Sequence, residues 1–359
     1  MIKRSLIQIL LLVFTFLPAF GQGTDSLGVK QRNDSSRKSF RLFEDDKPLE
    51  ISLEFNLTSY MRSKSNENYL NAVMVFNPGT SDSLRTKVKL RTRGIFRRQN
   101  CNYSPIELNF KGSHLPYSDL KSISKLKLVT QCQSGAINEN YLVREYLVYK
   151  LFNAMTDTSF RVRLLTVNYI DSEKKRKTVR QAAFFIEPVE MLAERTNTVQ
   201  VKSKMLNQRS MIPYIMDRVA IFNYMIGNYD WSVPGLHNIR VLKSKLLVSD
   251  PRGIAVPYDF DWSGLVNADY AIPADNVGIP TVRDRLFLGM CRSREVYIQE
   301  LKQFAGKKPE FYKIINEFKL ISKRDKEDII GFMDSFFDKL SGKRDLSSLF
   351  FETCKIIKP

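Results

Sequence analysis

The stretch Leu84-Arg85-Thr86-Lys87-Val88-Lys89-Leu90 decides the fold of the first half of this 359-residue chain. Its charged side chains occupy every second position and alternate with apolar or small ones. A period of two is typical of a β-strand that buries one face and exposes the other. The same alternation recurs at Leu49–Phe55, Val73–Phe76, Ile106–Phe110 and Leu126–Leu128. The sequence therefore predicts half-buried antiparallel strands that form a sheet in this region.

A helix is predicted after this sheet, followed by two more strands. Tyrosine, leucine and phenylalanine side chains recur at helical spacing between Asn138 and Asn153. The segments Val162–Ile170 and Gln181–Ile186 again favour strands, and the charged run Lys174–Lys177 between them is typical of a solvated turn. These elements complete a strand-rich lobe over residues 49–190.

Helices dominate the remaining residues, 191–359. The segment Lys323–Leu340 has the apolar spacing of an amphipathic helix, and a pair of strands is expected around Ile239–Val241 and Ile254–Val256. A strand-rich half followed by a helix-rich half predicts an α+β fold of two lobes.

The first residues have the features of an export signal. Lys3 and Arg4 precede a largely apolar run from Leu6 to Leu17, and small residues follow at Ala19 and Gly21. We therefore expect a signal peptide at residues 1–21 and a flexible polar leader at residues 22–48. The exported chain, in the periplasm or outside the cell, should contain no transmembrane span, because the apolar run is the longest in the sequence and is shorter than the roughly 20 residues required.

Charge and cysteine content narrow the classes of partner. The formal net charge of +18 favours anionic partners such as nucleotide phosphates, acidic polysaccharide or lipid head groups. Nucleic acid is a less favoured partner, because the basic residues are spread along the chain without interleaved aromatic residues. The four cysteines allow three pairings in an exported protein, or could remain buried thiols. We favour a disulfide between Cys101 and Cys132, because both flank predicted strands of the same lobe.

Three short segments carry the residues that a magnesium-nucleotide site needs. They are Gly227-Asn228-Tyr229-Asp230-Trp231, then His237-Asn238, then Pro257-Tyr258-Asp259-Phe260-Asp261-Trp262. One acid can accept or orient a hydroxyl proton, while the asparagine and the second acid can hold the metal ion. Asp and Asn are also common in turns and caps, so each residue alone is weak evidence. Their joint order, after apolar segments, indicates phosphotransfer chemistry.

This order resembles the spore-coat-H-type (CotH) kinase-like family, in which a G-N-x-D-W element precedes an asparagine and a D-F-D or D-Y-D element. It is more loosely similar to the HipA-type kinases. The resemblance implies an atypical two-lobed kinase-like fold, with one main helix in the strand-rich N-lobe, and ATP with Mg²⁺ or Mn²⁺ as cofactors. It places Asp230 in the catalytic role and Asn238 and Asp259 in the metal role, with Asp261 as a second metal ligand or a helix cap. Asn238 departs from the family pattern, because it lies eight residues after Asp230 (238 − 230), farther than in the family.

The N-terminal half offers candidate cations for the phosphates. Lys127 on a predicted strand and Glu145 on the following helix, eighteen residues later (145 − 127), resemble the lysine–glutamate pair of protein kinases. Lys125 shares the strand face of Lys127 and is the rival candidate. Arg91 and Arg93 precede Gly94 in an R-x-R-G element that resembles one in the spore-coat-H-type family, and paired guanidinium groups suit phosphate. A solvated strand face is the alternative explanation for all of these cations.

The sequence leaves two hypotheses about function open. The first is an exported kinase-like phosphotransferase that uses Mg-ATP to phosphorylate a protein or another hydroxyl acceptor. The second is a catalytically inert module that binds an anionic ligand or a partner protein outside the cytoplasm. With two histidines, His114 and His237, a multi-histidine zinc site is excluded, and no G-x-S-x-G element supports a serine hydrolase.

Overall fold

The structure is a computed structural model that describes residues 39–62, 68–113, 115–246, 250–340 and 345–355. The expected signal peptide and residues 22–38 of the expected leader lie outside the described residues. The remainder of the leader is packed on the folded chain, because Leu42 is buried and the ring of Phe40 lies 5.1 Å from that of Phe76.

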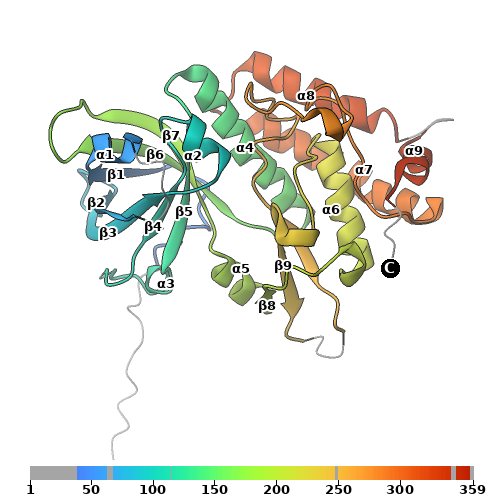
Figure 1. Ribbon diagram of the computed structural model, residues 1–359, viewed down its shortest axis with the longest axis horizontal. Coiled ribbons are helices and arrows are strands. Elements are labelled where there is room, and N and C mark those ends of the chain that lie inside the picture. Colours follow the sequence, from blue (N-terminus) through green and yellow to red (C-terminus); the bar gives the residue numbers. More distant parts are fainter. Residues whose placement is uncertain (1–38, 63–67, 114, 247–249, 341–344, 356–359) are drawn as a thin grey trace, which may run out of the picture. The chain divides into compact units, whose positions relative to one another are not determined.

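Seven strands of the N-terminal half close into a barrel (Figure 1). Their order around the barrel is β1-β2-β3-β4-β5-β7-β6. β1 and β6 are parallel, with Ile51 opposite Val167, and every other neighbouring pair is antiparallel. The strands are β1 (Leu49–Phe55), β2 (Leu70–Phe76), β3 (Leu84–Thr92), β4 (Ile106–Asn109), β5 (Lys125–Thr130), β6 (Val162–Asp171) and β7 (Val179–Ile186).

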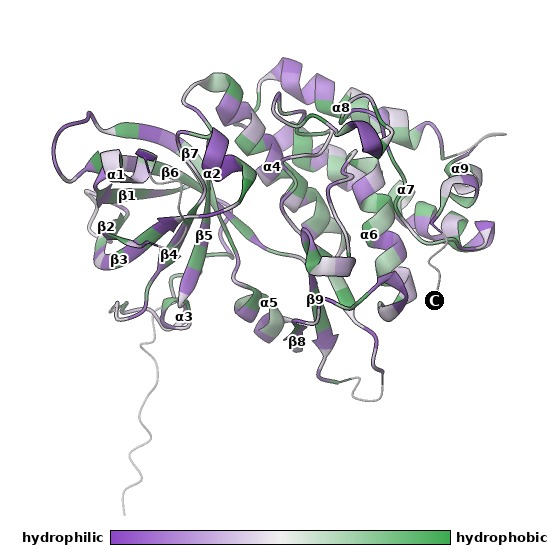
Figure 2. Cartoon of the chain, viewed as in Figure 1, coloured by the Kyte–Doolittle hydropathy of each residue, from purple (hydrophilic) through white to green (hydrophobic). Residues whose placement is uncertain are grey.

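Apolar side chains from alternate positions fill the barrel. Along β3, Thr86, Val88 and Leu90 are buried while the intervening lysines are exposed. Colouring by hydropathy shows the same alternation along the barrel strands (Figure 2). The period of two in the sequence therefore corresponds to the inner and outer faces of the barrel wall.

Helices and a small sheet form the rest of the described chain. The sheet has the order β10-β9-β8 and is antiparallel throughout. Short 3₁₀ turns occur at Gln208–Ser210, Pro234–Leu236 and Asp275–Val277. The remaining elements are α1 (Leu57–Arg62), α2 (Phe96–Asn100), α3 (Ser118–Lys121), α4 (Ala136–Met155), α5 (Val189–Arg195), β8 (Thr198–Val201), α6 (Pro213–Met225), β9 (Ile239–Ser244), β10 (Ile254–Pro257), α7 (Arg294–Glu317), α8 (Lys323–Phe337) and α9 (Leu346–Thr353).

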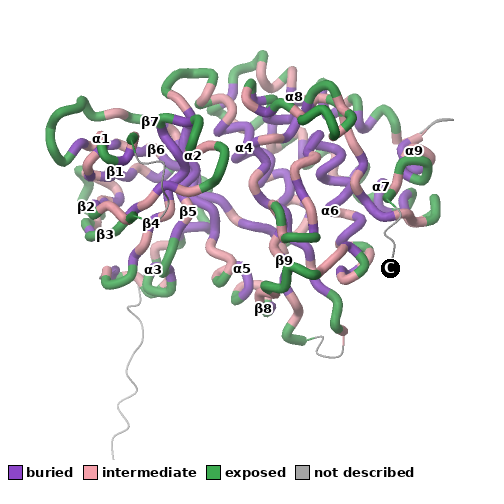
Figure 3. The backbone as a smooth tube through the Cα atoms, viewed as in Figure 1, coloured by how far each residue is buried: buried purple, intermediate pink, exposed green. Residues whose placement is uncertain are grey.

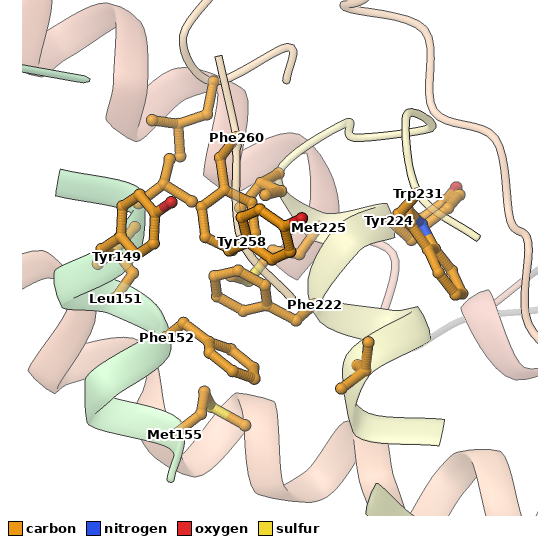
Figure 4. Packing of buried hydrophobic residues seen from close by; sticks show 14 of the residues in the cluster. Tyr149, Leu151, Phe152, Met155, Phe222, Tyr224, Met225, Trp231, Tyr258 and Phe260 are labelled. Atoms are coloured by element: carbon orange, nitrogen blue, oxygen red, sulfur yellow. The ribbon is translucent and has the colours of Figure 1, made fainter. Parts of the chain in front are cut away.

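Helix α4 lies between the barrel and the C-terminal helices (Figure 1). Its apolar side chains belong to one buried cluster together with those of α6, α7 and α8. The ring of Phe152 is 4.7 Å from that of Phe222 on α6, and the ring of Tyr149 is 4.8 Å from that of Phe260 (Figure 4). Most of α4 and α6 is buried (Figure 3). A helix buried on nearly all sides is a central element rather than a surface one.

The two-lobed kinase-like fold predicted from the sequence is wrong. The strands form a closed mixed barrel, and the main helix α4 shares one core with the C-terminal helices as well as packing against β6 and β7. Alternation indicates which face of a strand is buried but not which strand lies beside it. The pairing of β1 with β6, which joins Leu49 to Leu165, closes the barrel across more than a hundred residues of sequence. The position of Asn138–Asn153 was predicted correctly, but its packing partners were not.

Two disulfides link segments that are distant in sequence. The predicted Cys101–Cys132 pairing is confirmed, with Cα atoms 4.6 Å apart, and the second disulfide joins Cys291 to Cys354. Disulfides persist mainly in oxidising compartments, so the pairing is compatible with an exported protein. In the part of the chain that the structure describes, no helix combines the length and apolar character needed to cross a membrane.

Candidate functional site

A cavity of about 320 Å³ brings the sequence motifs together. One wall is the segment from Arg93 to Arg97, which follows β3 and enters α2. Asp230, Asn238 and Asp259 line the same cavity. Larger cavities lie elsewhere in the described chain, but they contain none of these acids. Residues that are 137 positions apart in sequence (230 − 93) therefore face the same space.

The Gly227-Asn228 pair fixes the loop that carries Asp230. Gly227 has φ +68°, and a Cβ at this position would come within 2.9 Å of the carbonyl oxygen of Val282, so glycine is required here. The buried Asn228 side chain donates to Asn223 Oδ1 at 2.8 Å and accepts the backbone N–H of Asp230 at 3.1 Å. The asparagine of this motif is thus a support for the loop.

Asp230 contacts both His237 and Asn238. Its Oδ1 lies 2.7 Å from His237 Nε2, and its Oδ2 accepts a hydrogen bond of 2.9 Å from Asn238 Nδ2. The same amide group donates to the backbone carbonyl of Asp230 at 2.8 Å, so the amide oxygen of Asn238 remains available for a cation. The hydrogen bond with Asp230 raises the pKa of His237 above its ordinary value.

The long loop between Asp230 and Asn238 folds back on itself. The backbone N–H of Ser232 donates to the carbonyl of His237 at 2.9 Å, and a 3₁₀ turn at Pro234–Leu236 reverses the chain between them. The eight-residue spacing that departs from the family pattern therefore still places Asn238 against Asp230. His237 is brought to the cavity by the same loop.

The β9–β10 hairpin places Asn238 next to the segment that contains Asp259. Ile239 is paired with Pro257, and the backbone N–H of Tyr258 donates to the carbonyl of Asn238 at 3.0 Å. Both Asn238 and Asp259 have left-handed backbone conformations, with φ 49° and 66°. Such conformations cost roughly 1–3 kcal/mol each and are concentrated at functional sites. The backbone N–H of Asp259 donates to the hydroxyl of the buried Tyr149 at 2.8 Å.

Asp261 and Glu145 lie deeper, around a guanidinium group that the sequence analysis did not identify. Arg97 Nη1 is 3.9 Å from Glu145 Oε2 and 4.0 Å from Asp261 Oδ2. Burial, followed by the charge of Asp259, raises the pKa of Asp261 to about 7, and Tyr270 donates a hydrogen bond to its Oδ2. Burial and the charge of Asp261 also raise the pKa of Glu145 well above its ordinary value. Arg97 follows the R-x-R-G element by three positions, and its place beside that element was the one signal that could have identified it.

Lys127 and Lys125 share one face of β5 but have different surroundings. Lys127 Nζ lies 4.7 Å from the centre of the Tyr258 ring, which the guanidinium of Arg240 also contacts at 4.4 Å. Burial and the charges of Arg93 and Arg240 lower the pKa of Lys127 to about 7. Lys125 is exposed and pairs with Glu107 at 3.4 Å. Among the described residues, the ionic partner of Glu145 is Arg97 and not Lys127.

The two arginines of the R-x-R-G element point to different places. Arg91 binds Glu107 on the outer wall of the barrel, with Nη2 2.9 Å from Oε1, and lies over the ring of Tyr69. Arg93 lines the cavity. Strand β3 ends at Thr92, so the shared strand face assumed for the two residues does not extend to Arg93.

The available donors suit a hard cation. Asn238 and Asp259 offer oxygen atoms, which Mg²⁺ prefers, and Mg²⁺ is commonly held by one or two protein groups together with phosphates and water. No group of three or more His, Cys, Asp or Glu side chains is arranged for metal binding in the described ranges. The residues therefore fit a cation that is bound jointly with a nucleotide, rather than a cage built by the protein alone.

No protein-family model matches the chain, and a comparison with curated proteins finds no relative. Any functional assignment therefore depends on the geometry of the cavity and on the motif resemblance described above.

Proposed function

We propose that the protein is an exported phosphotransferase that uses ATP with Mg²⁺ or Mn²⁺ to phosphorylate a hydroxyl group on a protein or another acceptor. The observation that carries the proposal is the convergence of Asp230, Asn238 and Asp259 on one cavity that Arg93 also lines. The order of the motifs, which resembles that of the spore-coat-H-type family, supports it independently. The proposal does not depend on a two-lobed fold.

Acidic and basic side chains would have different roles in the cavity. Asn238 and Asp259 would hold the cation, which when bound would draw negative charge from the phosphate oxygens. Arg93, which lines the cavity, and Lys127, on which the charge of Asp259 acts, would neutralise the phosphates from the barrel side. A nucleotide would therefore be bound between opposite charges.

Asp230 would act on the acceptor. Its carboxylate is partly exposed and is held in place by His237 and Asn238, so it can orient a hydroxyl group and accept its proton. The acceptor oxygen would then form a bond to the γ-phosphorus while the bond to the bridging β–γ oxygen breaks and ADP leaves. His237, whose Nε2 lies 2.7 Å from Oδ1 of Asp230, would take up the proton from Asp230, because the hydrogen bond with the carboxylate favours the charged imidazolium.

Calorimetric titration of the exported chain with ATP, with and without Mg²⁺, tests the binding half of the proposal. Asp259→Asn removes a carboxylate from the cation site and should weaken Mg-ATP binding by at least about tenfold, or about 1.4 kcal/mol. Asp82→Asn, which makes the same change in an exposed turn, should leave the affinity within about twofold. Absence of nucleotide binding with either cation would overturn the proposal.

A catalytically inert binding module is the second candidate. Both carboxylate oxygens of Asp230 already have partners in His237 and Asn238, which favours a structural use of this acid. Mg-ATP binding without transfer of labelled γ-phosphate to the protein itself or to hydroxyl-rich and acidic acceptors would favour this candidate.

A further inference from the structure

A second and larger cavity lies on the outer wall of the barrel, over strands β2, β3 and β4. Its volume is about 620 Å³, and it shares no residue with the cavity that contains Asp230. We call it the lysine groove and define it by Lys87, Lys89, Lys111, Asn71 and Asn109. A ligand bound in this groove would not depend on the proposed phosphotransfer activity.

Strand register builds the lysine groove. Lys89 lies between Asn71 on β2 and Asn109 on β4, and Lys87 is paired with Val73. Lys87 and Lys89 must face outward, because the alternate residues of β3 fill the apolar interior of the barrel. Their Cα atoms are separated by roughly 7 Å, as expected for two residues on one face of a strand. The lysines are therefore held on a rigid wall.

The charges of the lysine groove are not balanced. Lys87, Lys89 and Lys111 are exposed, and none of the three has a carboxylate partner within the described ranges. The acidic residue of the lining, Glu54, lies 3.5 Å from Arg85 instead. One row farther along the same wall, Glu107 neutralises both Arg91 and Lys125, at 2.9 and 3.4 Å. Uncompensated ammonium groups on one concave surface attract anions.

We propose that the lysine groove binds an acidic polysaccharide. Carboxylates of the polymer would pair with the lysines, and its hydroxyl groups would bond to the side-chain amides of Asn71 and Asn109. The Oδ1 of Asn109 already accepts the backbone N–H of Lys111 at 2.9 Å, so Asn109 would act through its amide nitrogen. The barrel is closed, so no strand edge is open to an added peptide strand. The lining contains no aromatic ring on which a nucleobase could stack. These two features favour a sugar polymer over a polypeptide or a nucleic acid.

The test titrates the exported chain with polygalacturonate and compares two charge-reversal variants. Lys87→Glu/Lys89→Glu alters the groove, and Lys302→Glu/Lys313→Glu makes the same change in net charge at exposed positions of α7. The groove variant should bind at least about tenfold more weakly than the wild type, whereas the α7 variant should stay within about twofold. Binding should also weaken as salt rises toward about 0.15 M. Circular dichroism of both variants checks that they remain folded.

Three results would overturn the proposal. Equal weakening in both variants would mean that net charge alone attracts the polymer. Tighter, groove-dependent binding of polyglutamate or single-stranded DNA would assign the surface to another class of polymer. Lack of binding to polygalacturonate at low salt would remove the ligand altogether. Asn71→Ala provides a finer check: it should weaken binding of polygalacturonate without changing its salt dependence, because it removes a hydroxyl partner and no charge.

Discussion

Two clusters of charged residues on the barrel wall differ in how their charges are balanced. In the outer cluster, Glu107 is surrounded by Arg91, Lys125 and the hydroxyl of Tyr69, so its charge is matched at contact distance. Lys127 lies two positions along the same strand from Lys125, beside the ring of Tyr258, and Arg93 and Arg240 oppose its positive charge more strongly than Asp259 and Glu107 favour it. Glu107 therefore has cations at contact distance, whereas Lys127 has no carboxylate within ion-pair distance among the described residues.

This contrast separates a structural ion cluster from a binding site. Burial alone would raise the pKa of Glu107, but the contacts with Tyr69, Arg91 and Lys125 outweigh burial and lower it. Lys127 loses its proton near neutral pH, because burial and neighbouring cations disfavour its charge. A bound phosphate would restore that charge. We therefore expect mutations in the two clusters to affect different measurements.

The largest effect that distinguishes the two clusters is expected on nucleotide affinity. Lys127→Met should weaken Mg-ATP binding by more than about tenfold, because a hydrogen bond to a charged group contributes roughly 1.5–3 kcal/mol. Lys125→Met, on the same strand face, should leave the affinity within about twofold. Calorimetric titration of the two variants measures the difference. Equal losses would mean that the lysines act only through overall charge, and the distinction between the clusters would fail.

A pH effect of intermediate size follows from the pKa of Lys127. With that pKa at about 7, the lysine is mostly neutral above pH 7 in the free protein and charged below it. Phosphate favours the charged form, so ADP binding without metal should take up protons and weaken by up to about tenfold per pH unit between pH 7 and 9. Titration in buffers of different ionisation enthalpy measures the uptake. Lys127→Met should abolish it.

A smaller effect is expected on stability at the deep end of the cavity. The pKa of Asp261 in the folded protein is raised to about 7, so its contribution to stability is fully present below the unfolded pKa of 3.8 and is lost as the pH rises toward 7. Asp261→Asn should therefore stabilise the protein at pH 8 by roughly 1–2 kcal/mol and have little effect at pH 5. Urea unfolding at the two pH values tests this sign. Destabilisation at pH 8 would mean that Arg97 and Tyr270 need the charged carboxylate.

The smallest effect concerns the outer cluster. Glu107 has a lowered pKa, so its stabilising contribution is present above the unfolded pKa and is lost as the pH falls through the folded one. Glu107→Gln should cost about 0.5–1 kcal/mol at pH 7, because the cluster is only partly buried. Urea unfolding gives the cost, and nucleotide affinity should change far less than in Lys127→Met, because Glu107 contributes least among the groups that shift the pKa of Lys127. Loss of nucleotide binding in Glu107→Gln would link the two clusters.

Local features of the fold could be predicted from the sequence, but its closure could not. Alternation located β1 at Leu49–Phe55, and helical spacing located α4 to within two residues at each end. The pairing of β1 with β6 depends on contacts between distant segments that no local pattern specifies. The same limit led to the wrong assignment of α4 to an N-lobe.

The candidate site shows a similar division. The motifs identified Asp230, Asn238 and Asp259, and the structure places all three around one cavity. Arg97 was missed, because it lies on the five-residue helix α2, which has no apolar periodicity. Glu145 was expected to pair with Lys127, eighteen residues earlier in the sequence. Spacing along the chain does not specify which cation lies beside a carboxylate in space, and the structure places Arg97 next to Glu145.

The most direct test of the phosphotransfer proposal separates binding from chemistry at Asp230. Labelled phosphate transfer and calorimetric Mg-ATP binding are measured together for the wild type, Asp230→Asn and the Asp82→Asn control. The account predicts that Asp230→Asn keeps nucleotide binding and loses transfer by roughly 10²–10⁴-fold, because the carboxylate acts on the acceptor in the transition state. Equal transfer by Asp230→Asn and the wild type would contradict it.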